Sequence, residues 1–158
     1  MSAHRHLSLL SRTSAASALA LASLCGALLA PGCCSAAQAA SVSVSTRALH
    51  IAALKEGAPY VYGAAGPFRF DCSGLTYYAF RHAGRQLPRT AMAQYTHSRH
   101  IAASQRRLGD LVFFHWGRYV YHVGIYAGHN RIWHAPRRGG SVRLEHIWSR
   151  HAWYGRVS

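Results

Sequence analysis

Acidic residues and lysine are scarce in this chain. Its 158 residues include 4 Asp and Glu against 18 Lys and Arg, a formal net charge of +14. Lys55 is the only lysine, so arginine supplies almost all of the positive charge. A surface so short of carboxylates attracts polyanions through long-range fields that salt screens. The imbalance predicts an anionic partner, and the alternative is a solvated basic surface that reflects only an arginine-rich coding bias.

Cysteine is also scarce, and it is unevenly placed. Of the four cysteines, Cys25, Cys33 and Cys34 lie in the first 40 residues, and Cys72 stands alone in the rest of the chain. If the N-terminal segment is removed, Cys72 has no partner for an intramolecular disulfide. A lone thiol in an exported protein is then a buried free thiol, an intermolecular bridge, a metal ligand or a catalytic nucleophile.

The N-terminal segment has the pattern of a secretory signal. A basic leader up to Arg12 precedes an uncharged apolar run, residues 15–30, and small residues follow at 35–40. This pattern predicts a signal peptide over residues 1–39 and an exported protein, periplasmic or extracellular. The apolar run is short for a transmembrane helix. The alternative is a lipoprotein signal with a lipid anchor at Cys33, which the preceding glycine fits and Ala30 and Pro31 do not.

Export narrows the choice of polyanion. Anionic polymers of the cell envelope are then better candidates than nucleic acid, and we expect no nucleic-acid partner.

The sequence beyond the expected signal peptide predicts a short flexible tail, residues 40–45, and one domain over residues 46–158. Helical spacing predicts three helices, at 46–56 with Thr46 as its cap, at 72–83 with Asp71 as its cap, and at 90–98. Apolar and β-branched runs predict strands at 111–115, 120–127 and 131–135, and weaker patterns predict two more at 141–144 and 153–157. Helices followed by an antiparallel sheet indicate an α+β fold.

Cys72 falls in the first turn of its predicted helix. Free amide groups and the helix dipole favour an anion there, so we expect the helix to favour the thiolate. His122 is the candidate general base. In its strand, His122 and Gly124 share one face, while Val123 and Ile125 share the other and can pack into the core. Gly124 leaves room beside the histidine for another element, such as the cysteine helix.

A second histidine can reach the same face. If residues 128–130 form a three-residue loop, Ala127 opposes Arg131 and Gly124 opposes His134. His134 then lies one diagonal step from His122 and can orient it as the third member of a triad. A two-residue loop would turn His134 to the opposite face, so the prediction depends on register.

Zinc is the main alternative for these three side chains. Cys72, His122 and His134 are all zinc-ligand types, but no closely spaced Cys or His pair supports a metal site. The pattern therefore calls for neither a metal nor a cofactor.

Six segments in order resemble the NlpC-type family of cell-wall endopeptidases, which are bacterial enzymes with a papain-like fold. They are Pro59–Gly63, Phe70–Leu75, Leu87–Thr90, Leu108–Phe114, His122–Tyr126 and Trp133–Pro136. Tyr62 replaces the family's tryptophan in the first segment, and Leu108 replaces its proline in the fourth. Order and spacing agree across nearly all of the chain beyond the leader.

The resemblance implies a role for each matching residue. Cys72 is the nucleophile, His122 the general base and acid, and His134 the orienting residue. Residues matching Tyr60, Asp71 and Ser73 line the substrate subsite in similar enzymes. The implied substrate is a peptidoglycan stem peptide, cut at the γ-D-glutamyl to diaminopimelate (or lysine) bond through a thioester. The Cys72 amide is a candidate oxyanion donor.

Two alternatives to this function stay open at this point. In the first, the same Cys-His-His site serves a cell-wall amidase, an acyltransferase or an exported toxin that attacks a competitor's wall. In the second, which is a different class of protein, the chain is a basic, non-catalytic module that binds the envelope.

Overall fold

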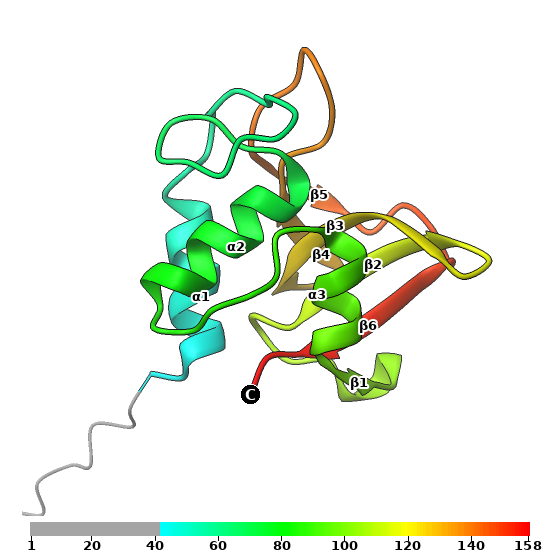
Figure 1. Ribbon diagram of the computed structural model, residues 1–158. Coiled ribbons are helices and arrows are strands. Elements are labelled where there is room, and N and C mark those ends of the chain that lie inside the picture. The colour runs from blue at the N-terminus through cyan, green and yellow to red at the C-terminus, as the bar shows by residue number, and fades with distance from the viewer. Residues whose placement is uncertain (1–41) are drawn as a thin grey trace, which may run out of the picture. The chain divides into compact units, whose positions relative to one another are not determined.

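The computed structural model describes residues 42–158 (Figure 1). The expected signal peptide and the alternative lipid site at Cys33 lie outside these residues. Within the described residues three helices come first, α1 (Val44–Ala53), α2 (Cys72–His82) and α3 (Ala91–His97). A short 3-10 turn, η1 (Ala103–Gln105), follows them. Within residues 42–158, no helix combines the length and apolarity that crossing a membrane requires.

Six strands form one antiparallel sheet in the order β1-β6-β2-β3-β4-β5. The expected α+β class is therefore confirmed. The short first strand follows α3 directly and was not predicted, and β5 begins two residues later than expected. The strands are β1 (Arg99–Ile101), β2 (Leu111–Trp116), β3 (Tyr119–Gly128), β4 (Arg131–His134), β5 (Arg143–His146) and β6 (Ala152–Arg156).

Side-chain caps set where the helices begin. Asp71 and Thr90 cap α2 and α3 by accepting hydrogen bonds from the backbone amides of Gly74 and Ala93. The first helix differs from the prediction, because Ser43 rather than Thr46 caps it. It therefore starts at Val44, inside the segment expected to be a flexible tail.

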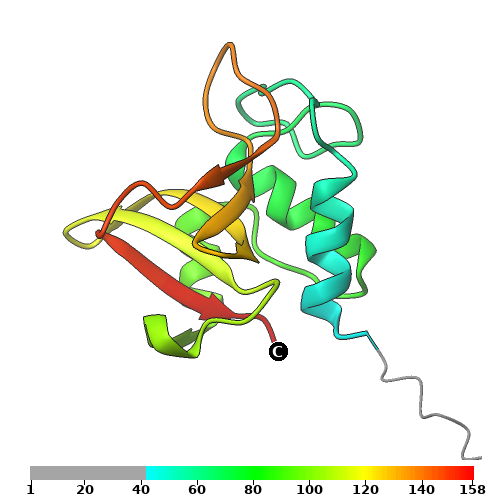
Figure 2. The same ribbon diagram turned by 180° about the vertical axis from the view of Figure 1, so that it is seen from behind.

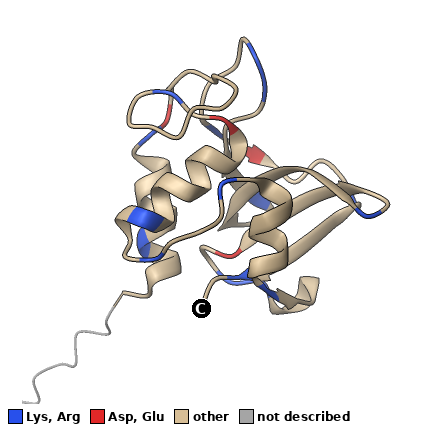
Figure 3. Ribbon diagram, viewed as in Figure 1, with Lys and Arg blue, Asp and Glu red and all other residues tan. Residues whose placement is uncertain are grey.

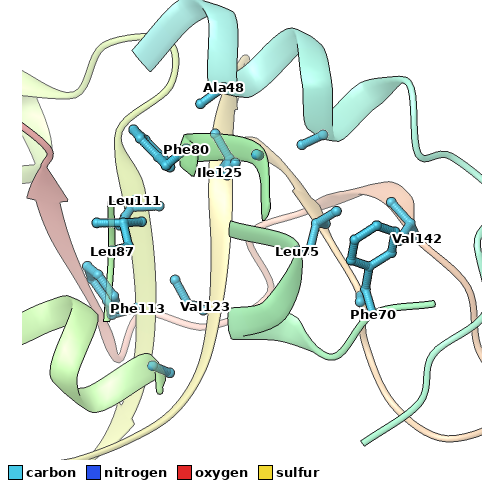
Figure 4. Close-up of a cluster of buried hydrophobic side chains, with 14 of the residues drawn as sticks. Ala48, Phe70, Leu75, Phe80, Leu87, Leu111, Phe113, Val123, Ile125 and Val142 are labelled. Atoms are coloured by element: carbon cyan, nitrogen blue, oxygen red, sulfur yellow. The ribbon is translucent and has the colours of Figure 1, made fainter. Parts of the chain in front are cut away.

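The helices cover one face of the sheet. α1 and α2 lie side by side in both views of the molecule (Figures 1 and 2). Leu75 and Phe80 of α2 pack with Phe113, Val123 and Ile125 of the central strands in one buried cluster (Figure 4). Burying such side chains is the main favourable term in folding. The apolar face of β3 is thus the helix side, as its alternation predicts.

The turn between β3 and β4 differs from the prediction, but the register beyond it does not. His129 and Asn130, both with positive φ, make a two-residue turn between Gly128 and Arg131. Ala127 is an extra, unpaired residue that forms a β-bulge in β3. The extra residue shifts the pairing by one position and so brings it back to the predicted register. Beyond the bulge Ile125 pairs with Trp133, as the expected register requires.

Gly124 makes room for β4 and not for the cysteine helix, which corrects the expectation. The helix packs on the opposite face, against Val123 and Ile125. A Cβ on Gly124 would lie 2.8 Å from Cδ1 of Ile132, 3.0 Å from the carbonyl oxygen of Trp133 and 3.2 Å from Cβ of His134. The glycine therefore lets the strand that carries His134 approach β3 closely.

Replacing Gly124 with alanine should destabilise the protein by about 1–3 kcal/mol, because the added methyl overpacks this contact. Urea unfolding measures the change. Ala127→Ser, a change of similar size in the bulge of the same strand, is the control and should stay within about 0.5 kcal/mol of the parent. An unchanged midpoint for Gly124→Ala would show that β4 moves away at no cost.

Candidate active site

Local structure places Cys72 as the first residue of α2. The Asp71 carboxylate accepts a 2.6 Å hydrogen bond at Oδ1 from the Gly74 amide, which fixes the helix start. The Cys72 side chain is half-buried against the main core. Its own amide has no backbone hydrogen-bond partner within residues 42–158. The amide is thus free to donate to a substrate oxygen.

Two histidines meet beside this cysteine. His122 on β3 pairs across the strand with Phe114, on the face away from the helices. Its Nε2 lies 2.9 Å from Nδ1 of His134, at the end of β4. The indole of Trp148 stacks on Phe114 and lies 5.6 Å from the His122 ring, between centroids. The structure therefore brings together the two histidines that strand parity placed on one face.

A fourth residue, which the sequence did not reveal, extends this chain. Nε2 of His134 lies 2.9 Å from Oε2 of Glu145 on β5. The Arg143 hydrogen bond is the main cause that holds the pKa of Glu145 below its usual value, so the carboxylate is ionised at neutral pH. The register of β5 explains the contact, because Ile132 pairs with Glu145 and so puts it diagonal to His134. The strand predicted at 141–144 ends one residue short of Glu145.

The carboxylate fixes the tautomer of both histidines. An ionised Glu145 can only accept, so Nε2 of His134 carries its proton and donates it. Nδ1 of His134 is then a lone pair that accepts from the Nε2–H of His122. His122 is left with its basic lone pair on Nδ1. This arrangement is that of a general base oriented through its second nitrogen.

The four residues open onto one cleft of about 450 Å³. Cys72, His122, His134 and Glu145 all line it, and Tyr60 and Trp148 stand at its sides. β4 ends at His134, so Val123 on β3 lies just beyond the last residue that β4 can pair with. The Val123 amide donates toward the Cys72 sulfur. Cys72 therefore reaches the face of the sheet that carries the histidines by passing the end of β4.

The three residues expected in the substrate subsite share a neighbouring cleft of about 660 Å³. Tyr60, Asp71 and Ser73 line it together with Cys72 and Arg89. The two clefts meet at Tyr60, Cys72 and Tyr121, which line both. The structure thus gathers every sequence-predicted site residue around the sulfur.

Arg89 is the second residue that the sequence did not single out. Its Nη2 lies 2.6 Å from Oδ2 of Asp71, and its Nη1 lies 3.0 Å from Oδ1 and 3.1 Å from the Ser73 hydroxyl. Burial opposes ionisation of Asp71, but hydrogen bonds from Arg89, Gly74 and Gly63 outweigh it and lower the pKa of the carboxyl group. The signal was the Leu87–Thr90 segment, whose arginine had no assigned role.

Electrostatics around the sulfur differ from the expectation for a helix start. Burial raises the pKa of the Cys72 thiol, and the neighbouring Asp71 charge raises it further, against amide donation from Val123 and Ser73. Burial and the adjacent His134 lower the pKa of His122 to about 3. The resting pair is therefore a thiol beside a neutral imidazole.

The raised thiol pKa predicts how alkylation depends on pH. Thiolate appears only as pH rises through the folded-state pKa, so the iodoacetamide rate should still climb above about pH 8.5, the ordinary thiol value. Asp71→Asn keeps a helix cap but removes the charge, and should move the inflection to lower pH. Mass spectrometry of the labelled protein follows the rate. A rate independent of pH between about 5 and 8 would instead indicate a resting thiolate–imidazolium pair.

Within residues 42–158, no group of three or more His, Cys, Asp or Glu side chains is arranged to hold a metal ion. Instead, His134 hydrogen-bonds Glu145 through Nε2 and His122 through Nδ1.

A cysteine at a helix start, packed on an antiparallel sheet that carries hydrogen-bonded histidines, defines the papain-like class of folds and sites. Within that class the chain belongs to the NlpC/P60 family, whose sequence profile matches residues 57–157. The family is the one that the six sequence segments resemble.

Known proteins support this membership. The chain is 46% identical over 101 residues to a probable endopeptidase of Corynebacterium glutamicum, covering 63% of this chain and 47% of that protein. The solved peptidoglycan hydrolase RipB of Mycobacterium tuberculosis is 26% identical, with a TM-score of 0.65 over 72% of this chain and 64% of that one.

RipD of Mycobacterium tuberculosis, described as a non-catalytic NlpC/p60 domain protein adapted to peptidoglycan binding, shares the fold. It is 22% identical, with a TM-score of 0.65 over 73% of this chain and 98% of that one. The chain spans from 18% to 47% of the length of the first curated relatives it matches.

Proposed function

We propose that this protein is a cysteine endopeptidase that hydrolyses peptidoglycan stem peptides. The observation that carries the proposal is the hydrogen-bonded series from His122 through His134 to Glu145, which opens onto the same cleft as Cys72. A nucleophile, a base and the groups that orient the base are all in place for acyl transfer.

The chemistry proceeds in two halves. The Cys72 sulfur attacks the carbonyl carbon while its proton passes to Nδ1 of His122. The Cys72 amide donates to the developing oxyanion. The C–N bond then breaks, and the amine leaves with the proton from His122. Water attacks the resulting thioester and gives its proton to His122, which returns it to sulfur as the C–S bond breaks.

The proposed bond is the γ-D-glutamyl link to diaminopimelate or lysine. Family membership and the name of RipB, a peptidoglycan hydrolase, support this class of substrate. The subsite side chains support a stem peptide that runs past Cys72, because Tyr60, Asp71 and Ser73 line one cleft beside the sulfur. Tyr60 also lines the histidine cleft, so one substrate can contact both.

A soluble disaccharide tetrapeptide tests which bond is cut. Mass spectrometry should find the disaccharide still joined to L-alanyl-D-glutamate, together with a dipeptide that begins with the diamino acid. An amidase would release the intact tetrapeptide, and an acyltransferase would join the acyl fragment to an added amine. Either pattern would overturn the proposed bond while leaving the Cys-His-His site in use.

The non-catalytic alternative predicts a different result, namely binding without turnover. RipD carries that description on the same fold. The geometry here favours catalysis, because Cys72 lies beside an oriented histidine pair and its amide is free. Intact substrate after prolonged incubation would support the binding module.

Export completes the proposal. The signal pattern over residues 1–39 would deliver the enzyme to the wall, and the excess of arginine would attract anionic polymers there. Such attraction would hold a small enzyme near its substrate.

A further inference from the structure

A third cleft, of about 390 Å³, shares no residue with the two clefts around Cys72. It lies among β1, η1, the loop after η1 and the end of β6. Figure 3 shows basic segments gathered beside the C-terminus with one acidic segment among them. Most of the lining residues are arginine, and the full set is Arg99, Ser104, Gln105, Arg106, Arg107 and Arg156.

Two of these arginines are held in place by the fold. Arg156 donates from Nε and Nη2 to the two oxygens of the buried Asp110, at 2.8 and 2.7 Å, and from Nη2 to the Gln105 carbonyl. Arg106 donates to the Ala103 carbonyl at 2.7 Å, and its guanidinium lies 4.9 Å from the Tyr154 ring centroid. Within residues 42–158, Nη1 of Arg156 and Nη2 of Arg106 keep no partner. Both guanidinium groups are therefore already oriented, each with a donor to spare.

The other two arginines have no structural task. Arg99 and Arg107 are exposed, and neither side chain makes a hydrogen bond or ion pair with another described residue. None of the residues lining this cleft carries a carboxylate. Asp110 is buried behind it, and its two oxygens already accept hydrogen bonds from Arg156 and from the Arg107 amide. The four arginines of the cleft therefore carry a net positive charge that an anion can neutralise.

We propose that this arginine cleft binds the phosphate groups of a phosphodiester-linked polyanion, of the poly(glycerol phosphate) kind. Guanidinium groups pair well with phosphate oxygens, and here they approach from three elements, which suits a tetrahedral group. The choice of an envelope polymer rests on the proposed wall substrate. Binding there would tether the enzyme while leaving the Cys72 clefts open.

A charge-matched pair of variants tests the site. Arg99→Gln/Arg107→Gln removes two charges from the cleft, and Arg85→Gln/Arg150→Gln removes two exposed charges elsewhere. Calorimetric titration with poly(glycerol phosphate) should show about a tenfold loss of affinity for the cleft variant, the equivalent of two charge-assisted contacts at the surface. The control should lose less than about twofold. Equal losses in both variants would overturn the proposal, since they indicate diffuse attraction only.

Other polyanions test the chemistry. Poly-L-glutamate of matched charge should bind the parent protein more weakly and should not distinguish the two variants. A tenfold loss for polyglutamate in the cleft variant would overturn the preference for phosphate. Tighter binding to phosphatidylglycerol vesicles or to duplex DNA than to the polymer, lost in the same variant, would overturn the choice of polymer.

Failure of this site and failure of the proposed function can be told apart. All titrations use the Cys72→Ala protein, so they do not depend on hydrolysis. Cleavage of the soluble disaccharide tetrapeptide by the Arg99→Gln/Arg107→Gln variant should equal that of the parent. A cleft variant that binds the polymer as well as its parent does would overturn the arginine cleft even if hydrolysis is confirmed.

Discussion

Replacing Cys72 with alanine should lower kcat for stem-peptide hydrolysis by about 10⁶-fold, as loss of the nucleophile does in serine hydrolases of similar mechanism. The sulfur is the only atom removed, and it makes the bond to the substrate carbon. Its side chain is half-buried, and within residues 42–158 no hydrogen bond depends on it apart from the amide contacts at the site. The variant should therefore fold as the parent does, with an unchanged near-ultraviolet circular dichroism spectrum.

Cys72→Ser is the matched variant for nucleophilicity. Serine keeps the size and the hydrogen-bonding capacity, but its hydroxyl is a far weaker nucleophile than a thiol in a site built for sulfur. It should be nearly as inactive as the alanine variant while still binding the soluble substrate. Activity near the parent level in the alanine variant would exclude covalent catalysis by this residue.

Replacing His122 with alanine should lower kcat by about 10³-fold, the usual contribution of a positioned general base and acid. Loss of this histidine leaves the thiol without a proton acceptor and the departing amine without a donor. His146→Ala, on an exposed position of β5, is the control and should leave kcat unchanged. The measurement is steady-state hydrolysis of the soluble disaccharide tetrapeptide.

The His122 variant should also respond to added base. Imidazole at high concentration should restore part of the lost rate, because the cleft of about 450 Å³ leaves space where the side chain stood. A variant that keeps the parent rate would show that another group accepts the thiol proton.

Periodicity in the sequence was enough to predict the arrangement of the histidines, although the details of the turn were wrong. In place of the expected three-residue loop, the chain has a bulge at Ala127 and then a two-residue turn at His129 and Asn130. Both give the same register beyond Ala127, because one extra residue in the strand offsets one fewer in the turn. His134 therefore reaches His122, as predicted.

Contacts between distant segments were harder to predict. Arg89 and Glu145 were missed because their roles come from neighbours that only the folded chain supplies, Asp71 in one case and His134 in the other. The predicted direction of the shift in the Cys72 pKa was wrong for the same reason. A helix start favours a thiolate, but burial and the Asp71 charge outweigh it here.

Mass spectrometry of muropeptides released from purified sacculi tests the central claim most directly. The parent protein should create new D-glutamate carboxyl ends and new amino ends on the diamino acid, and the Cys72→Ala protein should create neither. The same new ends from both proteins, or cleavage by the parent only in the glycan or at the lactyl amide, would contradict a Cys72-dependent endopeptidase.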